Sequence, residues 1–314
     1  MWWIYLIIAA AAALAVLLFI FVPLWLIARY IYRVLLVRTS KEKWSRECSW
    51  DDEEQCEMFR IGLAWGEEHE AAHRSVSVTS EGLRLVGEYF DFGNKKAVII
   101  IPGRMETCAY SYYFAKPYEE MGYNVLAIDN RSHGLSEGKY NTVGLREYKD
   151  IIAWAKLLRE EYGVESVALH GICIGGATAT YAAADEEGKQ YFSALVMDGT
   201  YNNFRIMMDA RFRDRKKPVF PFVPIIMAYL KRAAGRSAVK FSPISEIDKL
   251  EIPVLFFYSR EDVFTDPENV QKLYDKCKTK KRIHWFEKGI HSHLRINAQE
   301  EYDGQIKEFF KDYV

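Results

Sequence analysis

The chain has few cysteines and no excess of charge of either sign. Its 314 residues include five cysteines, an odd number without the spacing of a disulfide scaffold, as expected of reduced thiols. The 42 basic and 43 acidic residues give a net charge of −1, which excludes a globally basic surface of the kind that binds nucleic acids. Internal repeats and low-complexity tracts are also absent. We therefore expect no nucleic-acid partner.

Charged side chains are missing altogether from Trp2 to Ala28. A helix of this length would reach roughly 40 Å at about 1.5 Å per residue, enough to cross the hydrocarbon of a bilayer. A cleaved signal peptide fits less well, because the stretch is too long and has neither a basic start nor a small-residue cleavage site. We predict one transmembrane helix that anchors the chain to the lipid bilayer through residues 1–33.

Basic residues are absent before this anchor and frequent directly after it, from Arg29 to Arg46. The positive-inside rule then places the C-terminal part of the chain in the cytoplasm. A second basic stretch, Arg205–Lys217, contains six basic and two acidic residues. We favour a solvated face for it, and contact with anionic lipid headgroups or an acidic substrate remains the alternative.

After a juxtamembrane linker of residues 34–73, strand-like and helix-like patterns alternate over residues 74–314. Ser75–Thr79 and Leu83–Phe92 flank a Ser-Glu-Gly turn signal and predict a hairpin. The further strands are expected at Ala97–Ile101, Tyr123–Asp129, Ser166–His170, Ser193–Met197, Pro253–Tyr258 and Arg282–Phe286. Helices are expected at Cys108–Met121, Val143–Glu161, Ile174–Glu187, Pro267–Lys276 and Ala298–Phe310. The pattern predicts an α/β fold with a doubly wound, mostly parallel sheet that begins with an antiparallel hairpin.

One segment interrupts the alternation. Asn202–Ser242 shows no clear strand and carries three prolines among apolar residues. Because it lies between two predicted core strands, we expect an insertion over the carboxyl edge of the sheet. Its apolar side chains would line an acyl or aromatic pocket.

The stretch Gly171-Ile172-Cys173-Ile174-Gly175-Gly176 carries the strongest chemical signal. It joins a predicted strand to a small-residue helix and places a nucleophilic side chain, Cys173, at the turn. Glycines two residues before and two after the cysteine let strand and helix pack closely around a strained residue. This is the pattern of a nucleophile elbow, with cysteine in the usual place of serine. Thiols at a helix N-terminus beside histidine ionise readily and attack esters, thioesters and lactones more easily than amides.

A nucleophile needs a base and a group that orients the base. Asp262 follows the strand Pro253–Tyr258, and His291 follows the strand Arg282–Phe286, so the order is nucleophile, acid, base. Other assignments stay open. Glu261 or Asp198 could be the acid, His293 competes with His291, and the two histidines could also form part of a metal site. We favour Asp262 and His291, interpret His133 and His170 as structural hydrogen-bonding residues, and expect neither a metal nor a cofactor.

An oxyanion hole needs two backbone N–H groups, one of them directly after the nucleophile. Ile174 is in that position. The second N–H is expected from the loop that follows the strand Ala97–Ile101, with Arg104 as the candidate.

These residues resemble the α/β-hydrolase superfamily over about residues 74–314. The resemblance rests on Tyr123–Asp129, on Arg131–Ser136, on the elbow, on Asp262 and His291, and on the closing helix to Phe310. The chain is similar to bacterial membrane-anchored serine aminopeptidase-like and monoacylglycerol lipase-like hydrolases. This likeness implies a helical cap at about residues 202–242 and hydrolysis of a carboxylic ester or similar acyl bond.

Two positions depart from that group. Pro102-Gly103 stands where the group has His-Gly before the oxyanion loop, and Cys173 stands where it has serine, as in dienelactone hydrolases. The sequence thus predicts a membrane-anchored hydrolase with a Cys-His-Asp triad, acting on a small acyl-containing substrate. An acyltransferase or thioesterase with the same triad, and a ligand-binding homologue with little turnover, remain alternatives.

Overall fold

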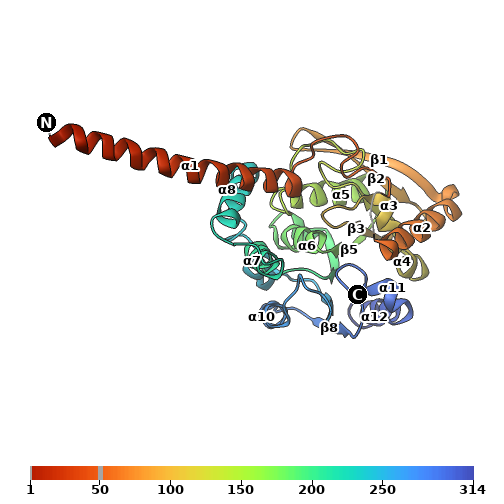
Figure 1. Cartoon of the computed structure of the whole chain (residues 1–314). Coiled ribbons are helices and arrows are strands. Elements are labelled where there is room, and N and C mark those ends of the chain that lie inside the picture. The colour runs from red at the N-terminus through yellow and green to blue at the C-terminus, as the bar shows by residue number, and fades with distance from the viewer. Residues whose placement is uncertain (1, 49–51) are drawn as a thin grey trace.

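The computed structural model describes residues 2–48 and 52–314, and its centre is an eight-stranded sheet (Figure 1). The strand order is β1-β2-β4-β3-β5-β6-β7-β8. The strands are β1 (His73–Ser80), β2 (Leu83–Phe90), β3 (Lys96–Ile101), β4 (Asn124–Ile128), β5 (Ser166–Ile172), β6 (Phe192–Asp198), β7 (Val254–Ser259) and β8 (Lys281–Phe286). β2 runs antiparallel to β1 and to β4, and the other neighbours are parallel. The predicted parallel sheet with an antiparallel start is confirmed.

Helices connect these strands. They are α1 (Trp2–Leu36), α2 (Glu53–Glu68), α3 (Cys108–Ser111), α4 (Lys116–Glu120), α5 (Tyr148–Glu160), α6 (Ile174–Ala184), α7 (Phe204–Asp214), α8 (Phe222–Ala234), α9 (Pro243–Glu246), α10 (Pro267–Lys276), α11 (Leu294–Asn297) and α12 (Gln299–Tyr313). One apolar core contains side chains of α5, α6, α8 and α10, and a second contains side chains of α2, α3 and α12.

The central strands are covered on both faces. In β3, Ile99 and Ile101 belong to the first core, whereas Val98 and Ile100 belong to the second. Alternate residues of a strand point to opposite faces, so a continuous apolar run is what a doubly covered strand requires. Helix α6 consists mainly of residues with small side chains and is buried along its whole length.

Two predicted helices were wrong in extent. The segment expected as one helix over Cys108–Met121 is broken into α3, a short 3-10 turn and α4. Pro117 lies in the first turn of α4, where a missing N–H is tolerated, and it disfavours continuous helix before it. The helix expected from Val143 begins only at Tyr148, because Val143 and Gly144 have positive φ angles of 53° and 89°.

Helix α1 projects from the body (Figure 1). Residues 2–23 are exposed, whereas Ala28, Tyr32 and Leu36 are buried against the rest of the chain. By length and composition, α1 could cross a membrane. Helix α2 lies within the predicted linker, yet its Met58 and Trp65 are part of the second core. The division of the chain into anchor, linker and catalytic domain stays a prediction.

The insertion predicted at Asn202–Ser242 contains α7 and α8 and no strand. Helix α8 packs against α1, where the rings of Tyr229 and Tyr32 stack with centroids 5.2 Å apart. The two helices lie at the edge of the body from which α1 extends (Figure 1).

Candidate active site

Cys173 occupies a sharp turn between β5 and α6. Its backbone has φ 54° and ψ −111°, a conformation that non-glycine residues rarely adopt. The turn is held by the N–H of Cys173, which donates to the carbonyl oxygen of Asp198 at 2.8 Å. A Cβ atom on Gly175 would lie 2.1 Å from the carbonyl oxygen of Ile101, and one on Gly171 would lie 2.4 Å from the backbone of α6. The predicted close packing of strand and helix is confirmed.

Asp262 and His291 meet at the carboxyl ends of β7 and β8. Nδ1 of His291 donates to Oδ2 of Asp262 at 2.7 Å. The other carboxylate oxygen accepts from the N–H of Phe264 at 2.7 Å. Glu261, the alternative acid, accepts instead from the N–H of Gly289 at 3.0 Å. The structure therefore places Asp262 against the imidazole.

The protonation states of His291 and Asp262 depend on each other. Burial opposes ionisation of His291, but the negative charges of Cys173 and Asp262, and the hydrogen bond to Asp262, raise its pKa well above the usual value. Burial likewise raises the pKa of Asp262, but His291 and the N–H of Phe264 outweigh it and hold the pKa below the usual value. Nε2 of His291 is buried and has no hydrogen-bond partner among the described residues.

Side chains from the loop after β4 hold the loop after β3. Nε2 of His133 lies 2.7 Å from the carbonyl oxygen of Arg104, and Nδ2 of Asn130 donates to the carbonyl oxygen of Pro102 at 3.1 Å. The ring of Trp44 stacks on His133 with centroids 4.4 Å apart. His133 is therefore a structural hydrogen-bonding residue, as predicted. Asn130 and Trp44 had not been assigned any role from the sequence.

Glu106 is a further residue that the sequence interpretation missed. Its carboxylate accepts from the N–H of Gly103 at 2.7 Å and from Nε2 of Gln55 at 3.3 Å, and only 6% of the residue is exposed. Burial raises its pKa, although those two bonds and the charges of His291 and His293 act in the opposite direction. The only signal in the sequence is an acidic residue in a short loop that precedes an apolar segment.

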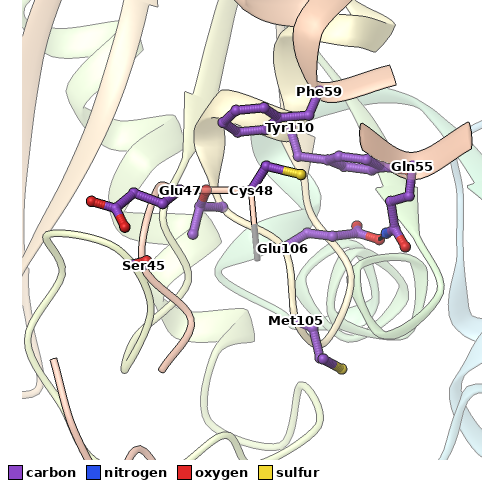
Figure 2. A pocket seen from close by; sticks show the side chains of 9 residues that line it. Ser45, Glu47, Cys48, Gln55, Phe59, Met105, Glu106 and Tyr110 are labelled. Atoms are coloured by element: carbon purple, nitrogen blue, oxygen red, sulfur yellow. Dashed lines mark hydrogen bonds between the residues drawn. The ribbon is translucent and has the colours of Figure 1, made fainter. Parts of the chain in front are cut away.

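A small cavity lies beside Glu106 (Figure 2). Its volume is about 20 Å³, room for about one water molecule. It is lined by Ser45, Glu47, Cys48, Gln55, Phe59, Met105, Glu106, Thr107 and Tyr110. Residues 45–48 thus pack beside the loop that follows β3.

His293 supports the loop that carries His291. Its Nδ1 lies 2.7 Å from the carbonyl oxygen of His291, and its Nε2 lies 3.2 Å from Oδ1 of Asp52 at the start of α2. Among the described residues, no group of three or more His, Cys, Asp or Glu side chains could hold a metal ion. The geometry gives His293 a role in positioning.

A buried polar network lies behind the elbow. His170 contacts the hydroxyl groups of Tyr118 and Tyr302 at 3.1 and 3.0 Å, and burial, with the charge of Arg295, lowers its pKa to about 3. Tyr302 also donates to Asp198 at 2.8 Å. His170 is thus a structural hydrogen-bonding residue, as predicted. Asp198 makes its hydrogen bonds in this network and at the elbow.

The insertion and the first helix both reach this site. The ring centroids of Phe264 and His291 are 4.6 Å apart. The guanidinium carbon of Arg211, on α7, lies 4.5 Å from the centroid of the Phe264 ring. Nη1 of Arg104 donates to the carbonyl oxygen of Leu35, near the end of α1, at 3.1 Å.

The chain has the α/β hydrolase fold, as its strand order, the strained turn after β5 and the inserted helices show. The family model of that description matches residues 96–231. The chain belongs to the α/β hydrolase family and is a hydrolase.

Among curated proteins, the chain is 30% identical to protein YqkD of Bacillus subtilis over 216 residues, which are 68% of this chain and 70% of YqkD. It is 23% identical to the membrane protein YNL320W of Saccharomyces cerevisiae, covering 61% of this chain and 62% of that protein. Among solved structures, the esterase Pf2001 of Pyrococcus furiosus superposes with a TM-score of 0.66 at 22% identity, covering 79% of this chain and 94% of the esterase. That likeness supports the fold.

Proposed function

We propose that the protein cleaves a carboxylic ester, thioester or related acyl bond through a triad of Cys173, His291 and Asp262. The observation that carries this proposal is the imidazole of His291, which bonds to Asp262 through Nδ1 while its buried Nε2 has no hydrogen-bond partner among the described residues. A base oriented by a carboxylate and coupled to a nucleophile at a strained elbow is the arrangement that acyl transfer needs. The esterase-like fold is consistent with it.

In the first half of the reaction, His291 takes the proton of the Cys173 thiol and the sulfur attacks the acyl carbonyl carbon. The tetrahedral intermediate collapses to an acyl-enzyme, and the leaving alcohol or thiol receives the proton from His291. In the second half, His291 takes a proton from water, whose oxygen attacks the thioester. The carboxylic acid leaves, and the proton returns to the sulfur.

The N–H groups of Ile174 and Arg104 would bind the oxyanion. Ile174 is the first residue of α6, where N–H groups lack partners within the helix. In the described chain we find no hydrogen bond to the N–H of Arg104 or of Ile174. Glu106, Asn130 and His133 hold the loop that carries Arg104, so the second N–H has a rigid support.

We further propose that α1 anchors the enzyme as a single transmembrane helix, with the catalytic part in the cytoplasm. The free part of α1 is apolar, and basic residues follow it directly. The relative YNL320W is named as a membrane protein, which agrees with the anchor but says nothing of its orientation.

A panel of p-nitrophenyl acyl esters of increasing chain length tests the triad in the detergent-solubilised full chain. Cys173→Ala should abolish turnover, whereas Cys48→Ala, which removes an exposed thiol, should leave it unchanged. Equal turnover by the Cys173→Ala variant and the original chain would refute the mechanism. Product analysis with added alcohols separates hydrolysis from acyl transfer.

A further inference from the structure

The turn between α7 and α8 combines positive charge with an exposed aromatic side chain. Phe220 is 73% exposed. We call residues 213–222, from the last two residues of α7 to the first of α8, the α7–α8 turn; Asp214 is its one acidic residue. The exposed basic residues of the turn are Arg213, Arg215, Lys216 and Lys217. A local excess of positive charge beside a large apolar side chain is typical of surfaces that bind anionic lipid membranes.

The length of the free part of α1 sets the level of a bilayer relative to the body. Residues 2–23 are exposed without interruption, and at about 1.5 Å per residue they extend about 33 Å. The hydrocarbon of a typical bilayer is about 30 Å thick. A membrane crossed by this stretch therefore ends close to Leu24, where α1 begins to contact the rest of the chain.

Helix α8 lies at that level. The centroid of the Trp25 ring is 6.4 Å from that of Tyr229, which also stacks on Tyr32, about two helical turns further along α1. Figure 1 shows α7 and α8 at the edge of the body nearest to the N-terminal part of α1. A bilayer around α1 would face this edge before any other part of the body.

We propose that the α7–α8 turn, residues 213–222, is a second membrane-binding surface, with Phe220 in the interfacial layer and the basic side chains on anionic lipid headgroups. The inference rests on α1 spanning a bilayer, as in the proposed function. The residues that follow the membrane-spanning stretch, Arg29 and Arg33, have the same sign of charge as the turn, so one anionic leaflet suits both. Arg211, two residues before this turn, lies over the Phe264 ring, which packs against the ring of His291.

Photocrosslinking of the full chain in lipid nanodiscs tests this surface. The photoreactive residue benzoylphenylalanine replaces Phe220 in one variant and Val314, also exposed but at the far end of α12, in a matched control. The nanodiscs contain phosphatidylcholine alone or mixed with phosphatidylglycerol. We expect several-fold more lipid adduct at position 220 than at position 314. The adduct should increase with phosphatidylglycerol and fall several-fold when Arg213, Arg215, Lys216 and Lys217 are all changed to Gln.

The same photoreactive residue at Leu14, in the exposed part of α1, tests the membrane anchor separately from the α7–α8 surface. Lipid adducts at position 14 with no excess at position 220 over position 314 would overturn the second surface and leave the anchor intact. Absence of adducts at both positions would overturn the anchor as well. An adduct at position 220 that is indifferent to phosphatidylglycerol and to the Gln changes would overturn the role of the headgroups. Ester hydrolysis by the same variants reports on the triad independently.

Discussion

At the scale of the residue, the chemistry depends on which carboxylate touches the imidazole. The three acidic side chains that were candidates for orienting His291 each have a different partner. Asp262 bonds to the ring, Glu261 bonds to the N–H of Gly289, and Asp198 bonds to Tyr302. Only the carboxylate bonded to Nδ1 can fix the tautomer in which Nε2 is free to accept a proton.

This arrangement predicts unequal effects of two neighbouring amide substitutions. Asp262→Asn should lower kcat for ester hydrolysis by about 10³- to 10⁴-fold, because the amide favours the wrong tautomer of His291. Glu261→Gln, which can keep an acceptor for Gly289, should change kcat little. Steady-state kinetics with one p-nitrophenyl ester provides the comparison. Similar losses in the two variants would contradict the assignment of Asp262.

Asp198 predicts a pH dependence of stability. Burial raises its pKa to about 7, since the hydrogen bond from Tyr302 and the charge of His291 only partly offset the desolvation and the neighbouring acids Asp262 and Glu106 add to it. In the unfolded chain this carboxyl ionises near pH 4. Between about pH 4 and about pH 7, the folded state holds a proton that the unfolded chain has lost, so stability falls as pH rises.

Asp198→Asn cannot ionise, and its Oδ1 can still accept from Tyr302. The variant should therefore gain stability relative to the original chain as pH rises from about 5 to about 8, by up to a few kcal/mol. Thermal unfolding of both proteins in detergent across this range measures the difference. Parallel stability curves would show that Asp198 does not titrate in this window.

At the scale of the element, the junction of β5 with α6 limits which residues the elbow accepts. The strain at Cys173 is maintained because β5, α6 and β3 approach more closely than any side chain at Gly175 would permit. Helix α12 provides a contrast, because a Cβ on Gly304 would meet no atom within 4 Å.

Two glycine-to-alanine substitutions should therefore have opposite effects. Gly175→Ala should destabilise the protein by about 3 kcal/mol or more, because its Cβ meets the backbone oxygen of Ile101. Gly304→Ala should stabilise it by up to about 1 kcal/mol through helix propensity. Denaturant or thermal unfolding measures both changes. A neutral Gly175→Ala substitution would contradict the close packing of the elbow.

At the scale of the whole molecule, α1 both projects from the body and takes part in the site. Its exposed part matches the thickness of a bilayer, and its last turns contact α8 and the guanidinium of Arg104. The loop after β3 and helix α1 are therefore parts of one packed structure.

The proposed orientation can be tested through the exposed thiol of Cys48. If the body lies in the cytoplasm, a membrane-impermeant maleimide cannot reach Cys48 in intact cells. The labelling yield at Cys48 should therefore be many times higher in permeabilised cells than in intact cells. Cys48→Ala is the control for labelling at other thiols. Ready labelling of Cys48 in intact cells would reverse the topology.

Much of the architecture could be predicted because it depends on local patterns. The sheet, the hairpin and the elbow at Cys173 follow from apolar runs, a turn signal and small residues, and each is present as expected. The errors occurred at Pro117, which interrupts the helix expected over Cys108–Met121, and at Val143-Gly144, whose positive φ angles delay the start of α5. The catalytic roles of Cys173, Asp262, His291, Ile174 and Arg104 stay predictions.

The sequence by itself determined the class of the fold, the order of the candidate catalytic residues and the presence of a membrane-length helix, because periodicity, glycine spacing and charge are local properties. Only the tertiary structure decided that Glu106 and Asn130 hold the loop after β3, that α2 supports His293 through Asp52, and that α8 packs on α1. These contacts join segments far apart in the chain, and their partners are chosen by the packing of the whole sheet.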